Sequence, residues 1–259
     1  MGRFSGKVAV ITGGAGGIGG ATVEELCDEG AQVVFGDVAV ALGEEKQSAM
    51  TARGHAATFA ECHVEVESDC KALVDLAIER YGRLDVLVNN AGIRNYQRVT
   101  EAEESSWDRI LGVNLKGYAF CAKYAIPAIE ASGGGSIVNV ASIRSIVAGA
   151  GTPQYDTTKA AILGLTRAMA RDHASQGLRV NAVGPGPIFT RFHAGRAAEL
   201  GLSEEQYVTQ FGADTLLKRP GTPLEVARAI AFLASDDASF ITGTCLFVDG
   251  GLTAFGEGR

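Results

Sequence analysis

Tyr155 and Lys159 are four residues apart in a stretch whose apolar spacing predicts a helix over 153–175. Side chains four apart share one face of a helix, so the hydroxyl and the ammonium are expected to be neighbours. A tyrosine with its ordinary pKa of about 10 is a poor base at neutral pH, and a nearby ammonium favours the phenolate. The pair therefore predicts general acid–base chemistry. The plain alternative is a tyrosine packed on the core and a solvated lysine.

Ser142 directly follows the apolar run Ser136–Ala141, which predicts a strand, and it precedes Tyr155 by 13 residues. This position puts its hydroxyl at the carboxyl end of the strand, where it can hydrogen-bond a substrate oxygen alongside Tyr155. The alternative is a helix or turn cap, and Ser145 is close enough in sequence to do the same chemistry.

A glycine-rich loop links the first predicted strand to the first predicted helix. Its sequence is T-G-G-A-G-G-I-G-G over 12–20, and it fits both G-x-G-x-x-G and T-G-x-x-x-G-x-G. Glycines there let the backbone approach a pyrophosphate, and the helix that follows offers free N–H groups to that anion. This context, with an acidic residue at the end of the next strand, predicts a dinucleotide site.

Asp37 is that acidic residue, and it lies 20 residues beyond Gly17. Its carboxylate can accept hydrogen bonds from the ribose hydroxyls of the adenosine, and it would repel a 2′-phosphate. No Arg or Lys lies within the loop or directly after Asp37. The sequence therefore favours NAD over NADP. Asp37 could also cap the helix predicted over 40–53.

Short apolar runs alternate with longer helix-like stretches along the whole chain. This alternation predicts right-handed βαβ units, hence an α/β fold: a Rossmann-type doubly wound parallel sheet of about seven strands with helices on both faces. We expect one NAD-binding domain over 1–259, in which the segment 187–221 is an insertion that covers the substrate. Predicted strands are Val8–Thr12, Gln32–Gly36, Ala56–Ala60, Leu84–Asn89, Ser136–Ala141, Arg179–Val183 and Cys245–Val248, and predicted helices are 17–29, 40–53, 67–81, 103–131, 153–175 and 223–234.

With these motifs in this order, the chain resembles the short-chain dehydrogenase/reductase family over essentially its whole length. The matching features are the glycine loop, Asn89-Asn90-Ala91-Gly92, Asn114, Ser142, Tyr155-x-x-x-Lys159, Pro185-Gly186 and the closing Val248-Asp249-Gly250-Gly251. The resemblance implies hydride transfer between a secondary alcohol and NAD, with Tyr155 as general base and Ser142 at the developing oxyanion. It also implies that Lys159 bonds the nicotinamide ribose, and that Asn114 kinks the helix 103–131 and holds a water linking Lys159 to solvent.

The cofactor-binding residues follow from the same resemblance. They are Gly13, Gly17, Ile18, Gly19, Asp37, His63, Val64, Asn90, Ala91, Gly92, Tyr155, Lys159, Pro185, Gly186, Ile188 and Thr190. His63 departs from the family pattern, which often has an aspartate there. It can hydrogen-bond or stack on adenine, or be a solvated loop histidine.

The substrate is expected to be a small polar molecule, such as a sugar or polyol, because basic side chains lie in the predicted pocket loops. The candidate substrate residues are Arg94, Arg144, Gln154, Arg191 and His193. Each arginine can equally be a surface charge. Two other functions stay open: a reductase of 3-oxoacyl thioesters or other ketones within the same family, and a nucleotide-binding regulator without turnover.

Composition excludes several other classes of function. With 23 basic and 30 acidic residues the net charge is −7, and the basic residues are dispersed, so neither nucleic acid nor a membrane is an expected partner. The four histidines lack metal-ligand spacing, so no metal site is predicted. Five scattered cysteines and the lack of a signal peptide predict free thiols and a cytoplasmic protein. The apolar closing segment, with Leu246, Leu252 and Phe255, suggests a homo-oligomer, and the resemblance makes it a tetramer.

Overall fold

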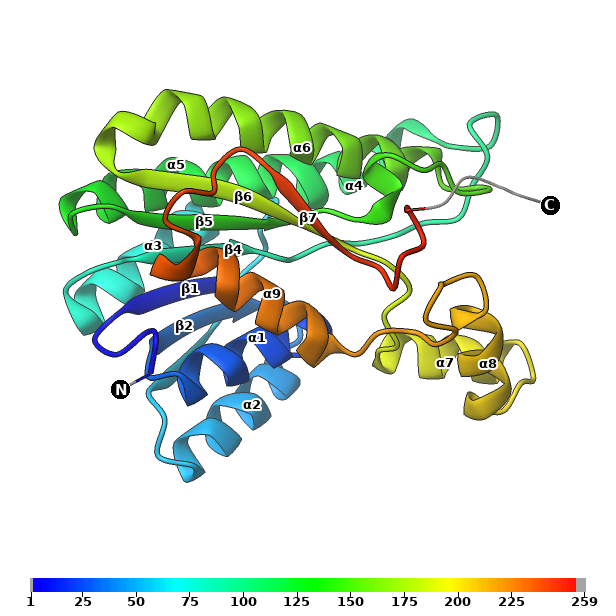
Figure 1. Cartoon of the computed structure of the whole chain (residues 1–259), viewed down its shortest axis with the longest axis horizontal. Helices are drawn as coiled ribbons and strands as arrows, with labels where there is room; N and C mark the ends of the chain where they lie inside the picture. Colours follow the sequence, from blue (N-terminus) through cyan, green and yellow to red (C-terminus); the bar gives the residue numbers. More distant parts are fainter. Residues whose placement is uncertain (1, 255–259) are drawn as a thin grey trace.

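The computed structural model describes residues 2–254, except for the side chains of Arg191, Phe192, Ala194 and Arg196. Its centre is a parallel sheet of seven strands in the order β3-β2-β1-β4-β5-β6-β7 (Figure 1). The strands are β1 (Val8–Thr12), β2 (Gln32–Asp37), β3 (Ala57–Glu61), β4 (Val86–Asn89), β5 (Gly135–Val140), β6 (Leu178–Pro185) and β7 (Cys245–Val248). The order reverses between β1 and β4, so the crevice in which nucleotides bind is expected at their carboxyl ends. The predicted doubly wound fold is confirmed.

Two layers of helices cover the sheet because its central strands are apolar on both faces. Every residue of β1 and β4 is buried. Helices α1 (Gly17–Asp28), α2 (Val40–Ala52) and α9 (Pro223–Ala234) lie on one face, where Val23, Leu26 and Ile230 are fully buried. Helices α3 (Glu67–Tyr81), α5 (Gly117–Ala131) and α6 (Pro153–His173) lie on the other.

The helix expected over 103–131 is three pieces rather than one. Helix α4 (Glu104–Leu111) passes into a π-helical turn, η1 (Gly112–Lys116), and the chain then continues as α5. The π-turn is centred on Asn114, whose side chain bonds the backbone of Ile93. π-Turns inside helices are often found at functional sites. Here the wider turn places a polar side chain in the interior.

The segment 187–221 forms a separate projection next to the carboxyl ends of the strands (Figure 1). It holds α7 (Arg191–Glu199) and α8 (Glu204–Gly212), and Ser203 begins α8 with a capping box. Its two ends are joined, because the Phe189 N–H donates to the Gly221 carbonyl at 3.0 Å and the Gly221 N–H donates to the Pro187 carbonyl at 2.9 Å. The excursion leaves β6 and returns at its own base, as an insertion should. Below we call it the 187–221 insertion.

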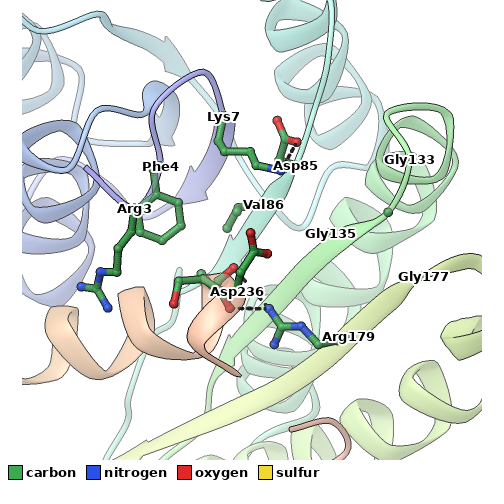
Figure 2. A pocket seen from close by; sticks show the side chains of 13 residues that line it. Arg3, Phe4, Lys7, Asp85, Val86, Gly133, Gly135, Gly177, Arg179 and Asp236 are labelled. Atoms are coloured by element: carbon green, nitrogen blue, oxygen red, sulfur yellow. Dashed lines mark hydrogen bonds and ion pairs between the residues drawn. The ribbon is translucent and has the colours of Figure 1, made fainter. Parts of the chain in front are cut away.

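The amino-terminal edge of the sheet carries a polar hollow of about 200 Å³ (Figure 2). Asp85 is nearly buried there; it accepts a hydrogen bond from the Val8 N–H and forms ion pairs with Lys7 and Arg83. Arg179 donates to backbone carbonyls at the end of α9, including that of Ser235. These charges are matched to protein groups, so we assign this hollow to fixing the strand starts.

No helix in residues 2–254 is long and apolar enough to cross a bilayer. The five cysteines are free thiols, and all but Cys245 are buried.

Candidate active site

The glycine loop forms a close-fitting cradle at the carboxyl end of β1. Gly13 and Gly17 have φ angles of +66° and +55°, which side chains other than glycine rarely adopt. A Cβ on Gly19 would lie 2.0 Å from the Gly13 carbonyl oxygen. Helix α1 begins at Gly17 with no side-chain cap, so its first N–H groups face the loop unblocked. An anion at this position would complete the helix start.

Asn90 ties this cradle to the neighbouring strand β4. Its side-chain NH₂ donates to the carbonyls of Thr12 and Gly13, each at 3.0 Å. The Thr12 hydroxyl in turn accepts the backbone N–H groups of Asn90 and Ala91. The side chain of Asn90 thus fixes the turn between β1 and α1. Its predicted contact with the cofactor stays a prediction.

Asp37 lies at the end of β2, and each of its two carboxylate oxygens accepts one hydrogen bond. Oδ2 accepts the Ala15 N–H of the glycine loop, and Oδ1 accepts the Ala39 N–H, each at 3.0 Å. Helix α2 begins at Val40 after Ala39, so Asp37 is not its N-cap. Each oxygen keeps lone pairs that can accept further hydrogen bonds. The next residue, Val38, is exposed and apolar, and so brings no positive charge to this place.

A cavity of about 480 Å³ connects the glycine loop, Asp37 and the end of β4. Its size is within the usual range for small-molecule and cofactor sites. The lining includes the following residues predicted to bind cofactor: Gly13, Ile18, Asp37, His63, Val64, Asn90, Ala91, Gly92 and Thr190. It also includes Val113 and Arg109, which the sequence motifs did not indicate. His63 lies at the margin, half-exposed, with Nε2 3.4 Å from Glu61 Oε1.

The nicotinamide side of the predicted site lies between β6 and the 187–221 insertion. Pro185 ends β6, and a Cβ on Gly186 would lie 2.6 Å from the Cα of Asp249, so glycine is required there. Ile188 is buried, and the methyl group of Thr190 is close to Gly17 of the glycine loop. The two halves of the predicted cofactor site therefore approach one another across the carboxyl edge.

Ser142 and Tyr155 are brought together beside this cavity. The Ser142 side chain follows β5 and lies close enough to Tyr155, near the start of α6, to lower the pKa of its hydroxyl. Ser142 also accepts the Arg144 N–H at 3.1 Å, so it both caps a short turn and contacts Tyr155. Ser145 does not compete for this role, because its hydroxyl donates to the Lys159 carbonyl.

Lys159 is buried behind Tyr155, with its Nζ 5.7 Å from the centre of the Tyr155 ring. The Nζ donates to the Val140 carbonyl at 2.8 Å and to the Tyr118 hydroxyl at 3.4 Å. Burial lowers its pKa to about 7. The alternative of a solvated lysine is therefore wrong. Tyr118, which the sequence analysis missed, lies four residues after Asn114, and this spacing was the available signal.

The pKa of Tyr155 is raised, whereas the sequence predicted that it would be lowered. Burial raises the pKa of Tyr155 above its ordinary value, and this effect outweighs the hydrogen bond from Ser142 and the positive charge of Arg94, both of which lower it. The expectation that Lys159 brings the pKa of Tyr155 down is thus wrong for this structure. Lys159 bears less charge than a solvated lysine for the same reason, since burial penalises charged forms.

Asn114 is fully buried and connects three segments around Lys159. Its Oδ1 accepts the Ile93 N–H at 2.8 Å, and its Nδ2 donates to the Ile93 carbonyl and to the Thr158 hydroxyl. A Cβ on Gly92 would lie 3.5 Å from Asn114 Oδ1 and 3.6 Å from Lys159 Nζ. Asn114 and Lys159 therefore flank the same glycine. The water relay implied by the resemblance stays a prediction.

Two of the five candidate substrate residues, Arg94 and His193, lie near Tyr155 or near each other. The Arg94 guanidinium lies over the Tyr155 ring, with its Cζ 5.1 Å from the ring centre. His193 bonds Thr190 through Nδ1 at 2.9 Å and stacks on Phe211. Burial, together with the nearby charge of Arg94, lowers the pKa of His193 to about 4.

The other three candidate substrate residues are Gln154, Arg144 and Arg191, and none of them has a described contact with Tyr155. Gln154 is fully buried and bonded to Asn95 and Ser106, which makes it a support of the loop rather than a substrate contact. The Arg144 guanidinium donates to the Ala148 carbonyl within its own loop. The side chain of Arg191 lies outside the described residues.

Comparison with known proteins agrees with this geometry. A family model described as enoyl-(acyl carrier protein) reductase matches residues 13–253. The chain is 42% identical to cis-4-hydroxycyclohexanecarboxylate dehydrogenase of Sinomonas cyclohexanicum over 97% of its own length and 98% of the relative. It is 39% identical to meso-2,3-butanediol dehydrogenase of Serratia marcescens, over 97% and 96% respectively. The ligand-free aldohexose dehydrogenase of Thermoplasma acidophilum superposes with a TM-score of 0.90 at 38% identity, covering 99% of this chain and 97% of that one.

The chain belongs to the short-chain dehydrogenase/reductase family. It is therefore an oxidoreductase of a family that uses nicotinamide cofactors. The residues present fit such a cofactor: the cradle leaves no room for a Cβ on Gly19, the start of α1 is uncapped, and Asp37 retains acceptor capacity at the far end of the cavity.

Proposed function

We propose that this short-chain dehydrogenase/reductase oxidises a small polar secondary alcohol, of sugar or polyol type, with NAD. One observation carries the proposal: Ser142 and Lys159 both lie beside Tyr155, next to a cradle that fits a dinucleotide. The substrate class is supported by three relatives, which are named for a hydroxylated ring acid, a diol and an aldohexose.

The proposed roles follow from where each group lies. Ser142 holds the alcohol oxygen beside the Tyr155 hydroxyl, and Tyr155 takes the proton of the alcohol as general base. This role requires that binding of cofactor and substrate offset the burial that raises the pKa of Tyr155. The nicotinamide, when bound, accepts the hydride from the carbinol carbon. Loss of that hydride and that proton converts the alcohol into a ketone. Lys159 bonds the nicotinamide ribose, and Asn114 keeps the route for the proton open toward solvent.

The choice of NAD depends on Asp37. Its carboxylate accepts only two N–H bonds, so it can also accept the adenosine ribose hydroxyls, and its charge repels a 2′-phosphate. The exposed Val38 next to it offers no compensating cation. The remaining predicted cofactor residues, His63 included, are proposed contacts around this anchor.

A second candidate function is reduction of a 3-oxoacyl thioester. The description of the matching family model, an acyl carrier protein reductase, favours it. The negative charge of Asp37 argues against it, because such a reductase would be expected to draw on NADPH.

The test is a panel of secondary alcohols and 3-oxoacyl thioesters, assayed with each nicotinamide cofactor by absorbance of the reduced form. The proposal predicts NAD-dependent oxidation of polyols or polar ring alcohols, and loss of turnover in Tyr155→Phe with cofactor binding retained. Undiminished turnover in that variant would refute the role of Tyr155. Faster NADPH-dependent reduction of thioesters would replace the proposal with the second candidate.

The chain is further proposed to be a cytoplasmic homotetramer with no nucleic-acid or membrane partner. In the closing segment, Leu246 of β7 is exposed, which suits an interface between copies. Phe255, the other end of that segment, lies outside the described residues. Scattering should give a mass four times the 26.9 kDa of one chain. A monomer mass would exclude the tetramer.

A further inference from the structure

Arg94 places a positive charge beside Tyr155 in the proposed reaction centre. It follows the Asn89–Gly92 turn at the end of β4, and its guanidinium lies between two aromatic rings. Its Cζ is 4.8 Å from the ring centre of Tyr96 and 5.1 Å from that of Tyr155. Tyr96 is exposed, and Tyr155 is the proposed general base. A substrate that reaches Tyr155 therefore passes close to this cation.

The guanidinium of Arg94 has no acceptor among the described residues. Its Nε is sealed from solvent and makes no hydrogen bond, and no described carboxylate lies within ion-pair distance. A charged donor that is buried without a partner destabilises the structure that holds it. By contrast, Arg83 and Arg219 each grip a carboxylate with two nitrogens. The two terminal nitrogens of Arg94 can form a two-pronged donor face of the kind that Arg219 uses.

The other side chains at this end of the pocket do not supply an anion. The 187–221 insertion contributes a cluster of rings, in which His193 stacks on Phe211 at 4.5 Å and Tyr207 lies 6.4 Å from Phe189. Burial and the charge of Arg94 lower the pKa of His193, so its imidazole is neutral at pH 7. The described surroundings of Arg94 are thus aromatic or neutral. They suit a substrate with an apolar ring and one negative group.

We propose that Arg94 binds a carboxylate of the substrate, so that the preferred substrates are short alicyclic hydroxy acids whose carbinol lies at Tyr155. This inference rests on the proposed dehydrogenase function and, among small polar secondary alcohols, favours hydroxy acids over uncharged sugars and polyols. A carboxylate matches the single guanidinium in charge and in its two acceptor oxygens. A phosphate dianion would require a second cation, and Arg144 is turned to the Ala148 carbonyl instead.

The test compares two inhibitors of the same shape that differ in charge. With NAD and cyclohexanol as reporter substrate, the inhibition constants of cyclohexanecarboxylate and cyclohexanecarboxamide are measured for the wild type, Arg94→Gln, Arg94→Lys and Arg98→Gln. Arg98 is an exposed arginine in the same loop and serves as the matched control. Thermal unfolding of each variant verifies that it is folded.

The wild type should bind the carboxylate at least tenfold more tightly than the amide. Arg94→Gln should remove this preference, Arg94→Lys should retain part of it, and Arg98→Gln should leave it unchanged. Equal binding of the two inhibitors by the wild type, or an equal loss in Arg98→Gln, would overturn the inference. If the wild type oxidises no alcohol at all, the proposed function fails. Calorimetric titration of the two inhibitors into the protein with NADH then still tests Arg94.

Discussion

Replacement of Gly19 by alanine should dismantle the cofactor cradle while leaving the rest of the fold in place. The added Cβ would lie 2.0 Å from the Gly13 carbonyl oxygen and 2.4 Å from Asn90 Nδ2. Contacts below 3.0 Å are essentially never seen for a Cβ, so α1 and the loop must separate by about 1 Å. Because both neighbours are held by backbone hydrogen bonds, neither can move away freely.

The size of the effect follows from the contacts that must be lost. Overpacking of this kind costs about 1–3 kcal/mol. Freeing Asn90 from the Thr12 and Gly13 carbonyls costs about 0.5–1.5 kcal/mol for each bond. A strain of about 2–6 kcal/mol placed on the cradle weakens NAD binding by roughly 30-fold to 20,000-fold, since about 1.4 kcal/mol is a factor of ten. Calorimetric titration with NADH measures this affinity, and urea unfolding measures the stability.

Gly20→Ala is the matched control, one residue further along α1. The nearest atoms to its added Cβ are at 3.5 Å, an ordinary contact. Alanine in a helix is favoured over glycine by about 0.8–1 kcal/mol, so this variant should be as stable as the wild type or more so, with the same affinity for NADH. If Gly19→Ala binds NADH as well as Gly20→Ala does, the cradle is not where the pyrophosphate lies and the steric argument is wrong.

Three further predictions concern the charges and amides of the site. Asp37→Ser should raise the ratio of kcat/KM with NADP to kcat/KM with NAD by a hundredfold or more, because it removes the charge that repels a 2′-phosphate; an unchanged ratio would contradict the role of Asp37. Asn114→Ala should lower the free energy of unfolding in urea by about 2–4 kcal/mol, because the buried N–H and carbonyl of Ile93 lose their partner; a change below about 1 kcal/mol would show that the π-turn stands without it. Lys159 has a pKa of about 7 when folded against an ordinary 10.5, so between these values the unfolded chain holds a proton that the folded chain has lost. Wild-type stability should therefore rise with pH across this window, by up to about 5 kcal/mol, and Lys159→Met should abolish the rise. Parallel pH profiles of the two proteins in urea unfolding would refute the buried, depressed lysine.

The strands were predictable because their signal is local. A parallel strand covered on both faces is a continuous apolar run, as in Val8–Thr12, whose bounds agree with the prediction. The edge strand Cys245–Val248 is also a continuous apolar run, and its bounds agree too. The helix 223–234 was predictable for a similar reason, since Thr222, Pro223 and Glu225 form a start signal before an apolar face. By contrast, η1 interrupts the predicted helix 103–131 because Asn114 bonds the distant backbone of Ile93. The spacing of apolar residues within 103–131 carries no information about that contact.

Local sequence patterns were enough to predict the α/β fold, the glycine loop proposed to bind a dinucleotide, and the grouping of Ser142, Tyr155 and Lys159. These are carried by motifs of a few residues, whose spacing on a strand end or one helix face follows from backbone geometry. Only the tertiary structure decided the electrostatics of the site. It buries Lys159 and much of Tyr155, which penalises their charged forms, and it brings Arg94, from the loop after β4, over the ring of Tyr155 on α6. Desolvation and charge proximity depend on segments far apart in the chain, and spacing along the sequence does not encode them.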